Sequence, residues 1–191
     1  DFFYIKYKLL NNTKDIWLRD FMPVKTKSGK YVSFRYEPSY LADDPQLRTN
    51  FKTDIAPSFK VDNLVYTDIN LDGGNVVFSP SKEKVIISDR VFSENHGISE
   101  AELTAKLEKW LEASVLIIPS LKSDMTGHAD GMVRFVGENT AIVNAPLSPY
   151  GFETKVKKAL QNHGIEVIDF PYFYSKGDSA VGCFLNYFFT R

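Results

Sequence analysis

The stretch Met132-Val133-Arg134-Phe135-Val136-Gly137-Glu138-Asn139-Thr140-Ala141-Ile142-Val143-Asn144 indicates the architecture of this chain. Two runs rich in β-branched residues flank a polar turn that contains glycine, which is the pattern of a β-hairpin. A helical pattern follows over about 152–163, and the apolar run 165–168 predicts another strand. The predicted unit is therefore strand, strand, helix, strand.

The same unit occurs earlier in the chain. The sequence predicts a hairpin over 75–88, a helix over about 99–111 and a strand over 115–118. The start of the pattern also appears at 31–36 and, near the C-terminus, at 183–190. Repeats of this length are typical of radial arrays and of solenoids. We therefore expect an α/β fold built from repeated units.

Acidic and amide residues stand at or near the entrance of the first strand of each unit. These are Asp20, Asp72, Asp130 and Asn186, and His128 precedes Asp130 by two residues. In a closed radial array such positions converge on the axis, whereas in an open solenoid they form a line. The first arrangement predicts a pocket for a cation that donates hydrogen bonds. His128 and Asp130 share a face only in an extended segment, so we expect extended backbone there.

A planar guanidinium group suits such a pocket. Carboxylates bind it through paired, charge-assisted hydrogen bonds, which also hold its central carbon in place for attack. The imidazole of His128 could protonate a leaving nitrogen and activate a water molecule. The remaining requirement is a nucleophile, and a thiolate is suited to attack at an amidine carbon.

Composition narrows the class of protein. The chain has 191 residues, of which 43% are hydrophobic and 25% charged, as in a soluble globular protein with a sizeable core. The net charge of -1 gives no electrostatic argument for nucleic acid or an anionic membrane as a partner. No apolar run approaches the roughly 18 residues of a membrane span. A single Cys fits a reducing compartment, so we expect a cytoplasmic protein, or a secreted one if a signal peptide was removed.

Three short motifs carry a resemblance to a known family. They are Trp17-Leu18-Arg19-Asp20, Asp72-Gly73-Gly74-Asn75 and Gly127-His128-Ala129-Asp130. In this order and at these intervals they resemble the agmatine deiminases and bacterial peptidyl-arginine deiminases, which are guanidine-modifying enzymes of the pentein superfamily. The resemblance implies a five-bladed α/β propeller. It also implies that residues 1–191 form a single catalytic domain that lacks the last unit or units.

The resemblance implies roles for individual residues. Asp20 and Asp130 match carboxylates that grip the substrate guanidinium, and His128 matches the general acid–base. Asp72, Trp17 and Asn186 match substrate-binding positions, although Asp72 also suits a tight turn and Asn186 a cap or bulge. The implied reaction is hydrolysis of a C–N bond of agmatine, in putrescine and polyamine synthesis, or of peptidyl-arginine. No metal or organic cofactor is implied.

One departure from the family pattern concerns the nucleophile. In the family it is a Cys of the fifth unit, whereas Cys183 falls in the strand expected to open the fourth. We therefore expect that the chain is incomplete at its C-terminus. We also expect that the 191-residue chain alone does not turn over a guanidine.

Two other functions fit the same residues. His128, Asp130, Asp124 and Asp72 could be the ligands of a metal-dependent hydrolase, since imidazole and carboxylate are suitable donors. The carboxylates could also bind arginine-like cations without turnover. The segment 37–60, rich in Pro and Asp, is typical of a long loop or insertion that could act as a lid. Nothing in the sequence indicates an oligomeric state.

Overall fold

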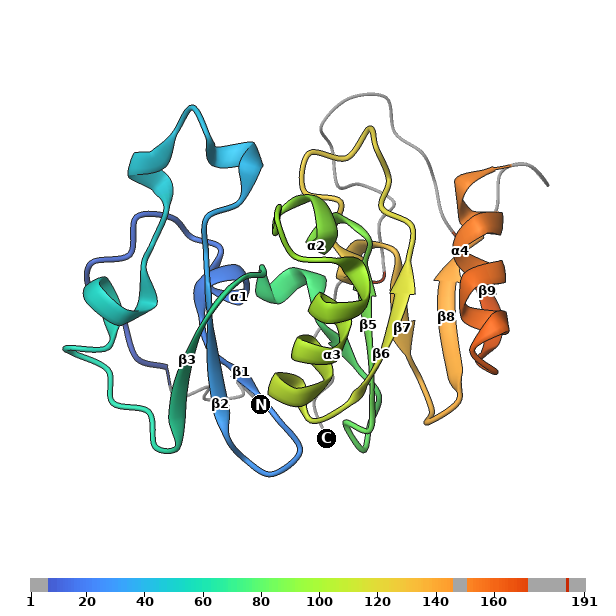
Figure 1. Ribbon diagram of the computed structural model, residues 1–191, viewed down its shortest axis with the longest axis horizontal. Coiled ribbons are helices and arrows are strands. Elements are labelled where there is room, and N and C mark those ends of the chain that lie inside the picture. Colours follow the sequence, from blue (N-terminus) through green and yellow to red (C-terminus); the bar gives the residue numbers. More distant parts are fainter. Residues whose placement is uncertain (1–6, 146–150, 172–184, 186–191) are drawn as a thin grey trace, which may run out of the picture.

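The computed structural model describes residues 7–145, 151–171 and 185. Its strands form three separate three-stranded sheets, which stand side by side across the molecule (Figure 1). In each sheet the first two strands are antiparallel and the second and third are parallel. The predicted α/β repeat is confirmed over these residues.

The strands follow the sequence prediction closely in the second and third units. The alternating run at 31–36 also forms a strand, and a strand at 64–70 that the sequence analysis did not predict completes the first sheet. The sheets consist of β1 (Val24–Lys25), β2 (Tyr31–Arg35) and β3 (Leu64–Asn70); β4 (Val77–Phe78), β5 (Lys84–Ser88) and β6 (Ser114–Ile118); and β7 (Val133–Phe135), β8 (Thr140–Asn144) and β9 (Glu166–Phe170).

Two long helices make the parallel crossovers of the second and third units. They are α3 (Glu100–Leu111) and α4 (Phe152–Asn162). The Ser99 hydroxyl accepts from the Glu102 N–H at 3.3 Å and caps α3, and Gly164, at φ +72°, follows α4 in the left-handed conformation that glycine favours. Both helix predictions are confirmed.

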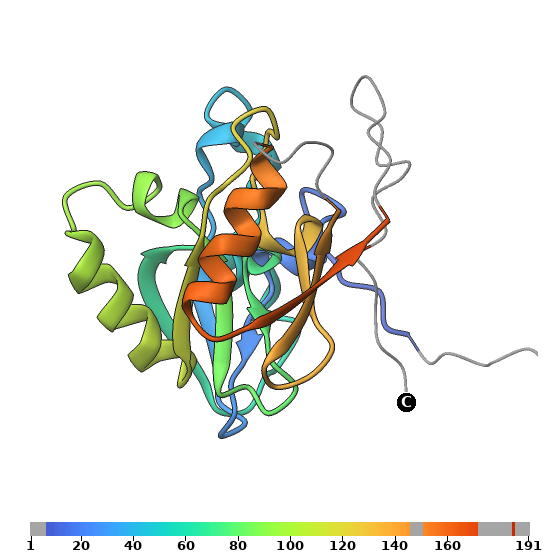
Figure 2. The same ribbon diagram turned by 90° about the vertical axis from the view of Figure 1, so that its right-hand side faces the viewer.

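Each long helix fills the space between two neighbouring sheets. Leu103, Leu107 and Leu111 of α3 are fully buried in a core that joins the first and second sheets. Val156 and Leu160 of α4 do the same between the second and third sheets. The turned view shows α4 packed across its sheet (Figure 2). Apolar burial, the main favourable term in folding, therefore fixes each unit against the next.

The first unit replaces the long helix with an irregular segment. Residues 37–60 form only short turns, η1 (Ser39–Leu41), η2 (Pro45–Leu47) and η3 (Phe51–Ile55). These turns pack on their own apolar cluster, in which Phe51 and Ile55 join Phe21. The prediction of a long loop or insertion is confirmed, and its buried residues show that it is a packed element.

A short helical turn precedes the first strand of each of the three units that the structure describes. These turns are α1 (Leu18–Phe21), η4 (Gly73–Asn75) and η5 (Ala129–Gly131). The prediction that His128 to Asp130 is extended is therefore wrong. Only His128 is extended, at φ −71° and ψ 145°, and a hydrogen bond from the Met132 N–H to the Ala129 carbonyl at 3.0 Å closes the turn that follows.

No helix within the described part of the chain is both long enough and apolar enough to span a bilayer.

Candidate active site

Three turns from three units bring the predicted acidic residues together. The turns α1 and η4 are in contact, and so are η4 and η5. They gather Asp20, Asp72, His128 and Asp130 at one place, where the last three are between 6% and 8% exposed. The expectation of convergence, rather than a line along a solenoid, is thus met for the first three units.

His128 lies between two carboxylates. Its Nε2 is 2.7 Å from Oδ2 of Asp72, and its Nδ1 is 3.7 Å from Oδ1 of Asp20. A carboxylate accepts hydrogen bonds, so Nε2 carries a hydrogen toward Asp72 whenever Asp72 is ionised. The nitrogen left to exchange a proton is then Nδ1, on the side of Asp20. Asp72 is therefore the orienting partner of the imidazole.

Glycine at position 74 makes this approach possible. Its N–H donates to Oδ1 of Asp20 at 2.9 Å. A Cβ at this position would lie 2.5 Å from Nδ1 of His128 and 2.6 Å from Oδ1 of Asp20. The Asp72-Gly73-Gly74 motif is thus a turn, as one interpretation of the sequence held. The backbone of Gly74 also packs directly against Nδ1 of His128 and Oδ1 of Asp20.

Asn75 ties the second unit to the third. Its side-chain oxygen accepts from the Ser88 N–H at 2.8 Å and from the Ala129 N–H at 3.2 Å. Asn75 is buried, where an unpaired amide would be costly. The bond from Ala129 holds η5 against η4 and so fixes the distance between His128 and Asp72, while the bond from Ser88 holds η4 on β5.

The proton affinities reflect burial opposed by charge. Burial raises the pKa of Asp20 to about 6, against the lowering effect of the His128 charge. Burial also raises the pKa of Asp130, although the charges of His128, Arg19 and Arg134 oppose this. Burial by itself would lower the pKa of His128, but the hydrogen bond and charge of Asp72 and the charges of Asp20 and Asp130 raise it overall. Such perturbed groups gathered at one place are typical of functional sites.

The other predicted site residues have different outcomes. Trp17 is 60% exposed immediately before α1, and its proposed place in a substrate pocket stays a prediction. Asn186 and Cys183 lie outside the described residues. Arg19 donates from Nη2 to the Val76 carbonyl at 2.8 Å and so links α1 to the second unit.

The metal-hydrolase alternative required Asp124 to join the site. Instead, Oδ1 of Asp124 accepts from the N–H and hydroxyl of Thr126 and from the Gly127 N–H, and so folds its own loop. Over 7–145, 151–171 and 185, no three or more His, Cys, Asp or Glu side chains are grouped to hold a metal ion. The described donors therefore do not form the predicted set.

Tyr40 is a site residue that sequence reasoning missed. Its hydroxyl donates to Oδ2 of Asp72 at 3.0 Å, and its ring and the His128 ring form a T-shaped pair with centroids 6.1 Å apart. Tyr40 comes from segment 37–60, for which a lid had been predicted without naming a residue. A small cavity at the site is lined by Asp72, His128, Arg90 and Glu94, among others.

Comparison with family models identifies the family of the chain. Residues 6–164 match the model of the Porphyromonas-type peptidyl-arginine deiminase family. The chain belongs to this family. The resemblance carried by the three motifs is confirmed, and all four converging residues of this deiminase-family chain lie within the matched range. A search of curated proteins finds no match.

Solved structures support the same fold. The chain superposes on a Cys-to-Ser variant of C. jejuni agmatine deiminase with substrate bound, with TM-score 0.62 and 18% identity over 87% of the chain. Enterococcus faecalis agmatine deiminase gives 0.60 and 18% over 85%, and DDAH from Pseudomonas aeruginosa complexed with citrulline gives 0.50 and 10% over 84%. The chain spans 55%, 52% and 55% of these three structures, respectively.

Proposed function

We propose that this chain binds a guanidinium group and carries the acid–base half of a guanidine deiminase, a hydrolase acting on C–N bonds. The observation that carries the proposal is the buried imidazole of His128 between Asp72 and Asp20, with Asp130 beside it. Three carboxylates face one imidazole in a water-poor site. A cation that donates several hydrogen bonds would offset that negative charge.

The proposed reaction has two stages, in which His128 first gives a proton and then takes one. A thiolate would add to the guanidinium carbon, and His128 would give a proton to the departing nitrogen, which leaves as ammonia. Water would then add to the resulting S-alkylthiouronium, lose a proton to His128, and release the thiol and a ureido product. Nδ1, facing Asp20 beside Gly74, is the nitrogen suited to these transfers. We expect the thiol to come from outside the described residues.

The fold proposal extends the three sheets to a closed ring. We propose that they are three of the five blades of an α/β propeller, with the turns α1, η4 and η5 at its axis. The likeness to agmatine deiminases and the convergence of the three turns support this. The substrate would be agmatine or an arginine within a peptide.

The first test compares two cations that differ only in the group at issue. Agmatine is expected to bind at least about tenfold more tightly than 1,4-diaminobutane, because only the guanidinium makes paired bonds to carboxylates. Calorimetry on the 191-residue chain measures both affinities, and an arginine-bearing tripeptide measured alongside distinguishes the two substrate classes. Equal affinities for the two amines would remove the basis of the proposal.

The affinity for agmatine is expected to depend on pH through Asp20. A guanidinium binds the ionised carboxylate, so protonation of Asp20 competes with it. Since the pKa of Asp20 is about 6, affinity falls roughly tenfold per pH unit below that value and levels off above it. His128 faces the same space with a raised pKa, so loss of its proton adds a second rise at higher pH.

Calorimetry at several pH values measures this profile. Asp20→Asn should remove the lower inflection and retain the upper one. An inflection near pH 6 that persists in that variant would contradict the assignment to Asp20.

A further inference from the structure

Tyr40 shares an acceptor with the catalytic imidazole. Its hydroxyl and Nε2 of His128 both meet Oδ2 of Asp72, at 3.0 and 2.7 Å. Two donors on one carboxylate oxygen restrict its rotation. The carboxylate then holds the imidazole in one orientation and one tautomer.

The direction of the hydrogen bonds around Tyr40 follows from chemistry. Burial raises the pKa of Tyr40, so its hydroxyl keeps its single hydrogen, and a carboxylate can only accept it. Oη of Tyr36 lies 3.4 Å from Oη of Tyr40. Because the Tyr40 hydrogen is directed to Asp72, Tyr36 is the donor in that second contact. The result is a chain from Tyr36 through Tyr40 to Asp72, which His128 meets from the other side.

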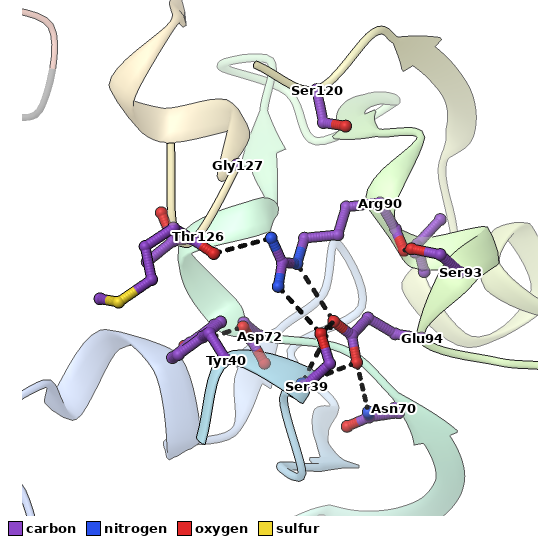
Figure 3. A network of polar contacts seen from close by, with 12 residues as sticks. Ser39, Tyr40, Asn70, Asp72, Arg90, Ser93, Glu94, Ser120, Thr126 and Gly127 are labelled. Carbon is purple, nitrogen blue, oxygen red and sulfur yellow. Dashed lines mark hydrogen bonds and ion pairs between the residues drawn. The ribbon is translucent and has the colours of Figure 1, made fainter. Parts of the chain in front are cut away.

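A polar clamp from the second unit holds Tyr40 in place. We call it the Arg90–Glu94 clamp; these residues stand at the two ends of the short helix α2 (Arg90–Ser93). Glu94 accepts from the Ser39 N–H at 3.0 Å and from its hydroxyl at 2.6 Å, and Nε of Arg90 donates to Glu94 at 3.1 Å (Figure 3). Ser39 directly precedes Tyr40, so the clamp fixes the backbone from which Tyr40 projects.

Arg90 ties the clamp to two further places. Its guanidinium lies 5.3 Å from the centre of the Tyr40 ring, which is the range of a cation–π contact. Its Nη1 donates to the Met125 carbonyl at 2.7 Å, in the loop that leads to His128. The clamp therefore joins the insertion of the first unit, helix α2 and the loop before η5 on one side of the site.

We propose that Tyr40, held by the Arg90–Glu94 clamp, is a positioning residue that fixes Asp72 and thereby the imidazole of His128. This rests on the proposed function for its catalytic meaning. The contact itself can be tested without any ligand. The hydroxyl of Tyr40 acts on His128 through Asp72, and the Tyr40 ring also packs against the imidazole.

The test is a proton titration of His128 by NMR in the 191-residue chain, with His128→Asn used to assign its signals among those of the three histidines. In Tyr40→Phe, His128 becomes the sole side-chain donor in this arrangement to Oδ2 of Asp72 and interacts with it more strongly. Its titration midpoint should therefore rise by about half a pH unit. Asp20, Asp72 and Asp130 face His128 and stay unchanged in this variant.

Tyr36→Phe is the matched control, because it removes the same atom one contact farther from Asp72. It should move the His128 midpoint by less than a third as much. Glu94→Gln loosens the clamp and should raise the midpoint by a smaller amount than Tyr40→Phe. An unchanged or lowered midpoint in Tyr40→Phe, or equal shifts in the two tyrosine variants, would overturn the proposal. The NMR titration contains no guanidine. Its outcome can therefore be interpreted even if the chain proves not to bind a guanidine.

Discussion

Gly73→Ala is expected to lower the free energy of unfolding by about 3 kcal/mol, the upper part of the range for overpacked sites. A Cβ at position 73 would lie 1.9 Å from the carbonyl oxygen of Arg19 and 3.1 Å from its carbonyl carbon. These atoms belong to the backbone of α1, so no side-chain rotation can make room. The turns of the first and second units would have to separate.

Gly131→Ala is the control, because a Cβ there meets nothing within 4 Å. It should leave the free energy of unfolding within about 0.5 kcal/mol of the parent. Denaturant unfolding followed by tryptophan fluorescence measures both variants. A stable Gly73→Ala protein that still binds agmatine would show that the contact between α1 and η4 is not needed.

Replacing either Asp20 or Asp130 should strongly weaken guanidinium binding. We expect Asp20→Asn and Asp130→Asn each to weaken agmatine affinity by about 100-fold, because each removes one charged acceptor from a buried ion pair. The amide keeps the size of the side chain, so packing is little changed. The Gly74 N–H, now facing an amide oxygen at position 20, retains an acceptor.

Asp68→Asn is the matched control for this loss, because Asp68 is an exposed carboxylate on β3. It should leave the affinity unchanged in the same calorimetric experiment. Unchanged binding in both Asp20→Asn and Asp130→Asn would mean that these carboxylates do not grip the cation, and the guanidinium site would have to be abandoned.

The repeated unit could be predicted from sequence because two periodicities alternate in it. Period-two runs give the hairpins, and the leucines of α3 recur at helical spacing. An acidic residue precedes the first strand of each of these units. When the units pack around one centre, these acidic residues are predicted to converge there. The same logic identified Asp20, Asp72, His128 and Asp130.

The pairing within the site could not be predicted from spacing. Which carboxylate meets His128 depends on how the backbones of α1, η4 and η5 stack, to within an ångström. That stacking depends on Gly73 and Gly74 and on the two bonds of Asn75. Tyr40 was missed for a related reason: it comes from an irregular insertion, where no periodicity indicates which side chain points inward.

The residues of the site come from three different units. Asp20 stands on the first unit, Asp72 on the second, and His128 and Asp130 on the third. A cation bound by both Asp20 and Asp130 would link the first unit to the third. It would also reduce the repulsion between the acidic groups at the site. By mass action, an occupant of this centre would also stabilise the contacts between the three units, so that binding of the occupant and cohesion of the units are thermodynamically linked.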